Sequence, residues 1–245
     1  MLRFFYVILA DLHHAYKVPK MGYYARHPEK YSEQFRYDYA KHCMRIMKKR
    51  GRITTEAHGM ENLPKENGYV MFANHQGKYD AIGIMDAHEK PCSVVMDDAK
   101  SHVPLIKQFI DLTNGKRMKL NDIRQASQVI KEVTEEVEEG RRFIVFPAGG
   151  YKHRNGNFVD PFKPGSFKSA MKAKAPIVPV ALFDSWKVFD LWSLRMVHTK
   201  VFFLRPLYYE EYKDMTSRQI CTLIYDRICK AVEYAKDQPE LAVLQ

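Results

Sequence analysis

The sequence predicts an α/β fold in which a mostly parallel sheet is flanked by helices. Three short runs are almost wholly apolar, as in strands buried on both faces of a parallel sheet: Tyr69–Ala73, Phe143–Phe146 and Ile177–Leu182. A segment with helical spacing, 122–139, stands between the first two, so strands and helices alternate as in right-handed crossover units. A chain of 245 residues accommodates one such domain and an appendage.

The predicted elements of this domain follow one another closely along the chain. We expect strands at 69–73, 93–96, 143–146, 177–182 and 201–204, and helices at 80–85, 122–139, 167–174 and 216–236. The helix at 122–139 is the clearest, because apolar residues recur every three or four positions, Asn121 or Asp122 can cap it, and Gly140 can end it.

The N-terminal fifth of the chain differs in composition from the rest. The formal net charge is +10, and residues 1–50 supply +7 of it through eleven basic and four acidic residues. Residues 2–16 and 29–49 each carry an apolar or aromatic stripe at helical spacing, joined by a proline-broken connector at 17–28. We therefore divide the chain into an N-terminal amphipathic two-helix motif, 1–50, and an α/β domain, 51–245.

Three interpretations of residues 1–50 are open. Basic, aromatic, amphipathic helices suit the interface of an anionic membrane, with lysines near the phosphates. The same helices could instead form a hairpin packed on its own domain. A nucleic-acid surface also fits aromatic residues interleaved with basic ones, but it is the least favoured interpretation.

Cysteine spacing and hydropathy bear on the compartment. The four cysteines are scattered without a metal-site or disulfide spacing (Cys43, Cys92, Cys221, Cys229), which favours a reducing compartment. No apolar run reaches the length of a membrane-spanning helix. The run Phe4–Ala10 is short for a signal peptide and is followed by Asp11, so we expect no export. These observations predict a peripheral or monotopic protein on the cytoplasmic face of a membrane.

A histidine and a carboxylate lie at the junction between the first strand and its helix. His75 and Asp80 are five residues apart, which on a continuous helix would turn them about 140° away from each other. They can meet only if the chain turns between them, and we expect Gly77 to supply that freedom. A carboxylate on one imidazole nitrogen would leave the other nitrogen as a general base. In isolation, the pattern would more often be a loop histidine capped by an aspartate.

The wider sequence resembles the glycerophospholipid acyltransferase family, which includes the 1-acylglycerol-3-phosphate acyltransferases. Asn74-His75-x4-Asp80 is similar to the first block of that family, and Phe146-Pro147-Ala148-Gly149 to its Phe-Pro-Glu-Gly block. The segments 162–170 and 175–181 resemble two later blocks, so the resemblance covers about residues 55–205.

One block departs from the family pattern. Ala148 stands where the family has glutamate, and Tyr151 where it has arginine. The alanine could be natural, marking another acceptor or a weakened enzyme, or it could be an introduced substitution. The intact remaining blocks favour the second explanation, and the sequence leaves both open.

The resemblance implies transfer of a fatty acyl group from acyl-CoA or acyl-carrier protein to a hydroxyl of a lysophospholipid, by default 1-acylglycerol-3-phosphate. His75 would be the general base and Asp80 its support, and the lack of an adjacent serine or cysteine favours direct transfer without an acyl-enzyme. No cofactor and no metal are expected. The residues predicted to bind substrate are Asn74, Lys116, Arg117, Lys119, Pro147, Ala148, Gly149, Gly150, Lys152 and Lys168.

The rival from another class is a catalytically weakened, membrane-associated lipid-binding protein of the same fold, suggested by Ala148. Among the basic residues, Arg117 is the preferred phosphate ligand because a guanidinium can grip phosphate with two hydrogen bonds. The sequence does not predict an oligomeric state.

Overall fold

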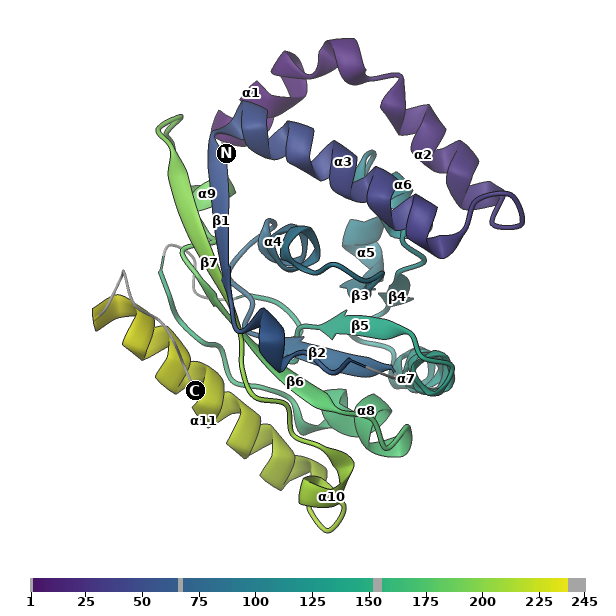
Figure 1. Ribbon diagram of the computed structural model, residues 1–245, viewed down its shortest axis with the longest axis vertical. Coiled ribbons are helices and arrows are strands. Elements are labelled where there is room, and N and C mark those ends of the chain that lie inside the picture. The colour runs from purple at the N-terminus through teal and green to yellow at the C-terminus, as the bar shows by residue number, and fades with distance from the viewer. Residues whose placement is uncertain (1, 66–67, 152–155, 238–245) are drawn as a thin grey trace.

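The computed structural model describes residues 2–65, 68–151 and 156–237, and in them a seven-stranded sheet is covered by helices on both faces (Figure 1). The strands are β1 (Ile53–His58), β2 (Tyr69–Ala73), β3 (Ser93–Asp97), β4 (Lys116–Met118), β5 (Arg142–Val145), β6 (Ile177–Phe183) and β7 (Val197–Phe203). The longer helices are α1 (Leu2–Ala10), α2 (Lys17–Arg26), α3 (Glu33–Gly51), α4 (Asp80–Ala87), α6 (Ile106–Leu112), α7 (Ile123–Glu138) and α11 (Ser217–Asp237). Shorter helical turns are η1 (Leu12–His14), η2 (Met60–Asn62), α5 (Asp98–Ser101), η3 (Pro164–Phe167), α8 (Lys168–Lys172), α9 (Lys187–Asp190) and α10 (Tyr209–Tyr212).

The strand order is β1-β7-β6-β2-β5-β3-β4, and every neighbouring pair is parallel except β6 and β7. The carboxyl ends of β2, β3, β4, β5 and β6 therefore meet at one edge of the sheet. In an open parallel sheet, that edge is where binding sites form. The predicted fold, a mostly parallel sheet flanked by helices, is confirmed.

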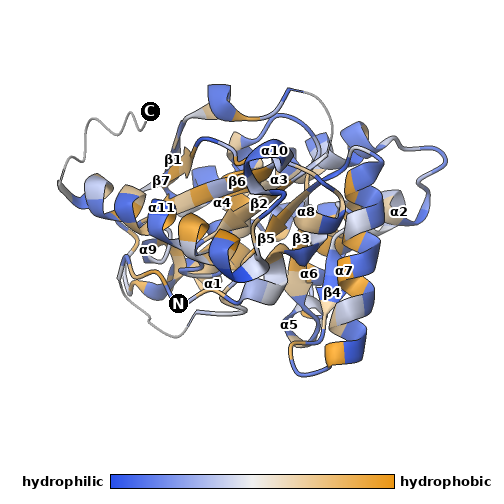
Figure 2. Cartoon of the chain, turned by 90° about the horizontal axis from the view of Figure 1, so that it is seen from below, coloured by the Kyte–Doolittle hydropathy of each residue, from blue (hydrophilic) through white to orange (hydrophobic). Residues whose placement is uncertain are grey.

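Each face of the sheet has its own apolar core. Successive side chains of β2 point to opposite faces, so Val70 and Phe72 join the cluster under α7, α8 and α11, while Tyr69, Met71 and Ala73 join the cluster under α3, α4 and α6. Figure 2 shows the strands as the most hydrophobic part of the chain, with polar helix faces outside. This double burial explains why the central strands are apolar without alternation.

Local sequence signals set the ends of α7 as predicted. The Asp122 side chain accepts a hydrogen bond from the Gln125 amide at the start, and Gly140 adopts φ +97° just after the end. The buried face carries Val129, Val133 and Val137. Two strands were not predicted: β1 at the sheet edge, and the three-residue β4.

The N-terminal segment holds three α-helices in 2–51 instead of the two that we predicted. The basic segment interpreted as a connector is α2, and the first predicted helix ends at Ala10. Pro19 does not break α2 because it is the third residue, where an amide has no partner within the helix. Among the described helices, none combines the length and hydropathy needed to cross a membrane.

These helices pack on the α/β unit. Tyr37, Ala40 and Met44 of α3 belong to the same buried cluster as the sheet, and the Tyr37 hydroxyl donates to the carbonyl of Met85 at 2.9 Å. The hairpin interpretation is therefore correct for this face of α3. The division of the chain at residue 50 and a role at a membrane stay predictions.

Arg3 fastens α1 to a segment that lies more than 180 residues later in the sequence, at 187–195. The side chain is fully buried and donates hydrogen bonds to the carbonyl oxygens of Lys187, Val188 and Arg195. Burial lowers the pKa of this guanidinium. Helix α1 thus holds the α9 turn, which follows directly on the carboxyl end of β6.

Candidate active site at the carboxyl edge of the sheet

The loop between β2 and α4 brings His75 and Asp80 together, as predicted. The Nδ1 of His75 lies 2.6 Å from Asp80 Oδ2, which fixes Nδ1 as the protonated nitrogen because the carboxylate can only accept. Asp80 is fully buried, whereas the His75 side chain is 20 % exposed. Among the described residues, no hydrogen bond reaches Nε2. This nitrogen is therefore available to accept a proton.

The same carboxylate organises the loop. Oδ2 also accepts hydrogen bonds from the amides of Gln76 at 2.5 Å and Gly77 at 2.9 Å, so the chain wraps around Asp80 at the start of α4. Gly77 does this without a positive φ, contrary to our reason for expecting a glycine. A Cβ there would lie 3.4 Å from Trp186 Cα, an ordinary van der Waals contact, so neither the backbone angle nor the space around this position requires a glycine.

Two aromatic rings enclose the His75 imidazole. Phe146, just past β5, stacks on it with centroids 4.3 Å apart, and Tyr151 meets it edge-on at 4.7 Å. The ammonium group of Lys100, at the end of α5, lies 5.7 Å from the centroid of the Tyr151 ring. The carboxyl ends of β2, β3 and β5 thus contribute to one site.

A glycine turn follows Phe146. Gly149 adopts φ +76°, a conformation that side chains rarely permit, and its amide donates to the Phe146 carbonyl at 3.0 Å. A Cβ on Gly149 would lie 2.9 Å from the Nζ of Lys163, so this ammonium group rests directly on the turn. The carbonyl of Pro147 holds the Lys163 amide at 3.0 Å. Ala148 is half-buried between Pro147 and Gly149, and Gly150 follows at φ 155°.

The predicted phosphate-binding residues fall into two groups. Lys116 is paired with Glu136 at 2.5 Å and Glu132 at 3.4 Å, and Arg117 with Asp111 at 2.5 Å. Although burial raises the pKa of Asp111, hydrogen bonds from Lys107 and Arg117 hold it below its usual value. Lys119 and Lys168 are exposed and form no ion pair with another described residue. Lys152 lies outside the described residues.

Asn74 occupies a different position from the other predicted contacts. Its side chain is fully buried and exchanges two hydrogen bonds with the backbone of Leu182 in β6, at 3.0 and 2.7 Å. It fastens the end of β2 to β6. A direct contact with substrate stays a prediction.

Sequence reasoning missed two residues of this site, Lys163 and Ser185. Lys163 lies in a segment that we matched to the family, but Lys168 was selected there instead. No local pattern marks Lys163, because its position depends on the hydrogen bond of its amide to Pro147, sixteen residues earlier. Ser185, 105 positions from Asp80, carries no local signal and donates to Asp80 Oδ1 at 2.5 Å.

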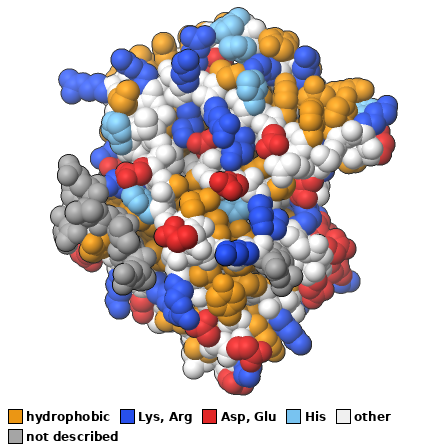
Figure 3. All heavy atoms as spheres, in the orientation of Figure 1, with side chains coloured by type: hydrophobic (Ala, Val, Ile, Leu, Met, Phe, Trp, Pro, Cys, Tyr) orange, Lys and Arg blue, Asp and Glu red, His pale blue; other side chains and the backbone are white. Residues whose placement is uncertain are grey.

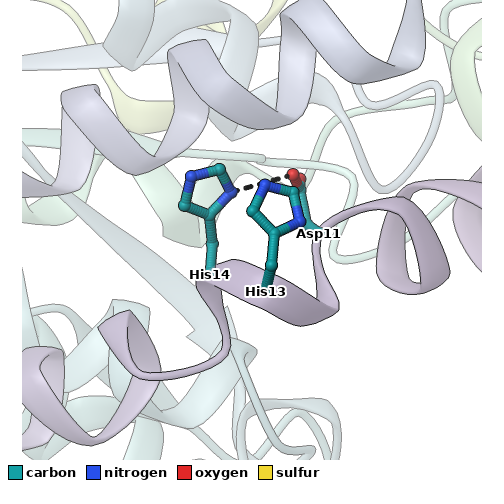
Figure 4. A group of neighbouring side chains, drawn as sticks. All are labelled: Asp11, His13 and His14. Atoms are coloured by element: carbon teal, nitrogen blue, oxygen red, sulfur yellow. Dashed lines mark hydrogen bonds and ion pairs between the residues drawn. The ribbon is translucent and has the colours of Figure 1, made fainter.

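One group of described residues has the spacing of metal ligands. Asp11, His13 and His14 offer ligand atoms within 4.8 Å of one another at the turn after α1 (Figure 4). Arg50 lies against the same atoms, with Nε 3.6 Å from Asp11 Oδ1 and a terminal nitrogen 3.3 Å from His13 Nε2. This guanidinium neutralises the negative charge that Asp11 would otherwise offer to a cation, so we interpret the group as an ion-pair cluster.

A cavity of about 530 Å³ opens beside that cluster, between α1 and the end of α3. Four of its lining residues are basic or histidine, and two are apolar or aromatic: His14, Lys49, Arg50, Arg52, Tyr6 and Ile46. Exposed apolar side chains continue along α1 and the turn after it: Phe5, Leu9, Leu12 and Tyr16. Figure 3 shows basic and histidine side chains among hydrophobic ones over the N-terminal helices.

Comparisons with known proteins point to one family. The model of the Acyltransferase family matches residues 54–183. Similar proteins include a 1-acyl-sn-glycerol-3-phosphate acyltransferase of Saccharomyces cerevisiae, 30 % identical over 52 % of this chain and 42 % of that protein. Another is the Escherichia coli protein of the same name, 28 % identical over 62 % of this chain and 61 % of that protein.

The chain spans about half the length of the first of these curated relatives. A protein of Borreliella burgdorferi with the same name is matched over 71 % of its length, at 25 % identity over 73 % of this chain. The crystal structure of the 1-acyl-sn-glycerophosphate acyltransferase PlsC from Thermotoga maritima has the same fold, with a TM-score of 0.73, 19 % identity, and coverage of 95 % of this chain and 93 % of that one.

Proposed function

Because the chain belongs to the Acyltransferase family, we propose that it transfers a fatty acyl group from an acyl thioester to the free hydroxyl of a lysophospholipid. The default acceptor is 1-acylglycerol-3-phosphate, which the names of its relatives contain. The observation that carries the proposal is the 2.6 Å contact between His75 Nδ1 and Asp80, which leaves Nε2 open to solvent and substrate.

In the proposed reaction, Nε2 of His75 accepts the proton of the acceptor hydroxyl while its oxygen attacks the thioester carbonyl carbon. The tetrahedral oxyanion collapses, the carbon–sulfur bond breaks, and the proton passes from His75 to the leaving thiolate. Asp80 stabilises the imidazolium that exists between these two transfers. Ser185 is buried on the carboxylate side of the pair and its hydroxyl donates a hydrogen bond to Asp80, which supports direct transfer without an acyl-enzyme.

The acceptor's phosphate needs cations near the Gly149 turn. We propose Lys163 as its principal ligand, assisted by Lys119 or Lys168, because these lysines have no competing carboxylate among the described residues. To bind the phosphate, Lys116 would have to leave its ion pair with Glu136, and Arg117 its ion pair with Asp111. Both remain candidates if those ion pairs break when the substrate binds.

We further propose that the turn after α1 rests on an anionic membrane. Leu9 and Leu12 are 66 % and 61 % exposed, and the basic cavity beside them would receive lipid phosphates. Leu9→Glu combined with Leu12→Glu should weaken cosedimentation with anionic vesicles. Tyr208→Glu, at the exposed aromatic residue just before α10, is the matched control. An equal loss of vesicle binding in the control would contradict a specific role of this turn in membrane binding.

The deciding experiment is product formation by the chain itself on vesicles that carry 1-acylglycerol-3-phosphate or other lysolipids. Acyl-CoA and acyl-carrier protein are supplied in parallel, with His75→Ala as the control. We expect turnover that falls ~10²–10⁴-fold in His75→Ala. Unchanged turnover in that variant would remove His75 from the mechanism.

Ala148 favours a second candidate function, that of a lipid-binding protein with weakened catalysis. The family glutamate at this position would place a carboxylate one residue from Gly149 and the Lys163 ammonium. If the wild-type chain gives no product and Ala148→Glu restores it, the chain is a disabled enzyme. If both bind lysolipid without any turnover, the binding-protein interpretation replaces the enzyme.

A further inference from the structure

Ser185 makes the contact that completes the hydrogen bonding of the buried carboxylate. The residue is 2 % exposed, and its hydroxyl donates to Asp80 Oδ1 at 2.5 Å. The other oxygen, Oδ2, is occupied by His75 and two backbone amides. By holding Oδ1, Ser185 keeps Oδ2 directed at His75 and at these two amides.

The backbone around Ser185 is built to present that hydroxyl. Asp184 adopts φ +62°, a left-handed conformation that aspartate tolerates better than most residues. The side chain of Asn157 stabilises it, accepting from the Asp184 amide at 2.7 Å and donating to its carboxylate at 3.0 Å. The Lys187 ammonium holds the second oxygen of that carboxylate at 2.8 Å.

Gln76 joins this turn to the histidine loop. Its Oε1 accepts from the Ser185 amide at 3.2 Å and lies 2.9 Å from the Ser185 hydroxyl, whose one proton has its shorter contact, 2.5 Å, with Asp80 Oδ1. Its Nε2 donates to Asn157 Oδ1 at 3.0 Å. The loop after β2 and the turn after β6 therefore form one hydrogen-bonded unit with Asp80 at its centre. A buried network of this kind is costly to interrupt, because each lost partner leaves a desolvated polar atom.

We propose that Ser185 is a positioning residue of the proposed acyl transfer, acting on His75 through Asp80. If the Ser185 hydroxyl is removed, Asp80 Oδ1 is buried without a hydrogen-bond donor. The carboxylate can then rotate toward a different donor. The His75 ring then loses its fixed in-plane orientation and its single tautomer. The expected fall in kcat rests on the proposed function, whereas the expected loss of a single His75 tautomer does not.

A nucleophilic role for Ser185 does not fit the geometry. A serine nucleophile needs its hydroxyl proton directed at the imidazole, as in a Ser-His-Asp triad. Here the hydroxyl is bonded to Oδ1 while the imidazole is bonded to Oδ2, so the carboxylate stands between the two side chains.

The kinetic test compares Ser185→Ala with variants that keep a donor. We expect kcat to fall about 10- to 100-fold with KM for both substrates unchanged, as for a reacting group displaced by about 1 Å. Ser185→Thr should restore most of the loss, and Ser185→Cys, with similar volume and a weaker donor, should be intermediate. If Ser185→Ala does not fold, Ser185→Cys takes its place in the comparison.

The matched control is Ser93→Ala. Ser93 is as buried as Ser185, and its hydroxyl also makes two hydrogen bonds, to the Thr113 carbonyl at 2.6 Å and from Arg141 at 2.8 Å. It lies at the start of β3, at the opposite edge of the sheet from the site. An equal loss of kcat in Ser93→Ala would mean that a general loss of stability, not positioning, explains the effect.

The second readout does not depend on turnover. Proton–nitrogen correlation spectra of histidine-labelled protein, assigned with His75→Ala, report which imidazole nitrogen carries the proton. We expect one Nδ1–H tautomer in the wild type and a mixture in Ser185→Ala. A single unchanged tautomer together with unchanged kcat would overturn the proposal. A tautomer change in a chain that acylates no lysolipid would sustain the positioning role and defeat the proposed function instead.

Discussion

The imidazole of His75 lies nearly face to face with the ring of Phe146, with the ring planes inclined by 23°. The two residues follow β2 and β5, which are parallel neighbours in the sheet, so a side chain beyond the end of β5 supports the imidazole beyond the end of β2. Asp80 fixes the direction of the Nδ1–H bond, whereas the stack fixes the plane of the ring. Both constraints are needed to aim Nε2.

Removing the stack should therefore lower the rate. We expect Phe146→Ala to reduce kcat about 10- to 100-fold, because the ring can then tilt away from the attacking hydroxyl. Phe146→Leu, which keeps bulk without a flat face, should give a smaller loss. Steady-state kinetics on both variants check this, and an unchanged kcat in Phe146→Ala would mean that the hydrogen bond to Asp80 orients the ring unaided.

Lys163→Ala should raise KM for the phosphate-bearing acceptor more than it lowers kcat. The lysine contacts the Gly149 turn, and the phosphate is part of the substrate before and during the reaction, so its loss weakens binding uniformly. Lys172→Ala, at an exposed lysine of α8, is the control. Comparable KM increases in the two variants would indicate a general effect of positive charge.

The buried imidazole of His88 should make folding stability depend on pH. Its Nδ1 donates to the Lys90 carbonyl at 2.6 Å and its Nε2 accepts from the Tyr69 hydroxyl at 2.5 Å, so both contacts suit the neutral ring. Burial lowers its pKa from 6.5 to about 4. Between these values the unfolded chain binds more protons than the folded one, so stability falls as pH decreases through the window and levels off below it.

The amount is on the order of 3 kcal/mol, at about 1.4 kcal/mol per pKa unit. Denaturant unfolding at several pH values measures it. In His88→Gln, which cannot titrate, we expect a shallower decline of the free energy of unfolding with acidification. His198→Gln, at an exposed histidine bonded to Thr54, should keep the wild-type slope. The same slope in all three proteins would contradict the assignment.

Arg3→Met should destabilise the fold by about 2–4 kcal/mol, since it leaves buried carbonyl oxygens without donors. Methionine preserves much of the side-chain length, so the loss reports the hydrogen bonds more than the packing. Thermal or denaturant unfolding measures it, with Arg218→Met on the exposed side of α11 as the control. If the free energies of unfolding of the two variants differ by less than about 0.5 kcal/mol, the hydrogen bonds of Arg3 do not stabilise the fold.

The sequence predicted the central strands and α7 because these elements are specified locally. Tyr69–Ala73 is β2 without any change of boundary, and Asp122 caps α7 through its own side chain. The contact of His75 with Asp80 was also predictable, because five residues and a turn leave few other geometries. In contrast, β4 has only three residues, too few for periodicity to show.

What the sequence could not predict depends on distant pairs. Ser185 and Asp80 are brought together only by the adjacency of β6 and β2, which no local pattern encodes. Likewise, Arg3 resembles a surface arginine in sequence until its partners near residue 190 are known. Pro19 misled for another reason: its effect depends on where the helix begins, and that start has no side-chain cap.

The Arg3 contact also sets an order of events during synthesis. Its first partner lies 184 residues further along the chain. A ribosome adding about 5–20 residues per second takes about 10–40 s to produce that partner. Throughout that interval the guanidinium of Arg3 has none of its carbonyl partners. Helix α1 is therefore synthesised well before the three carbonyl groups that its arginine binds.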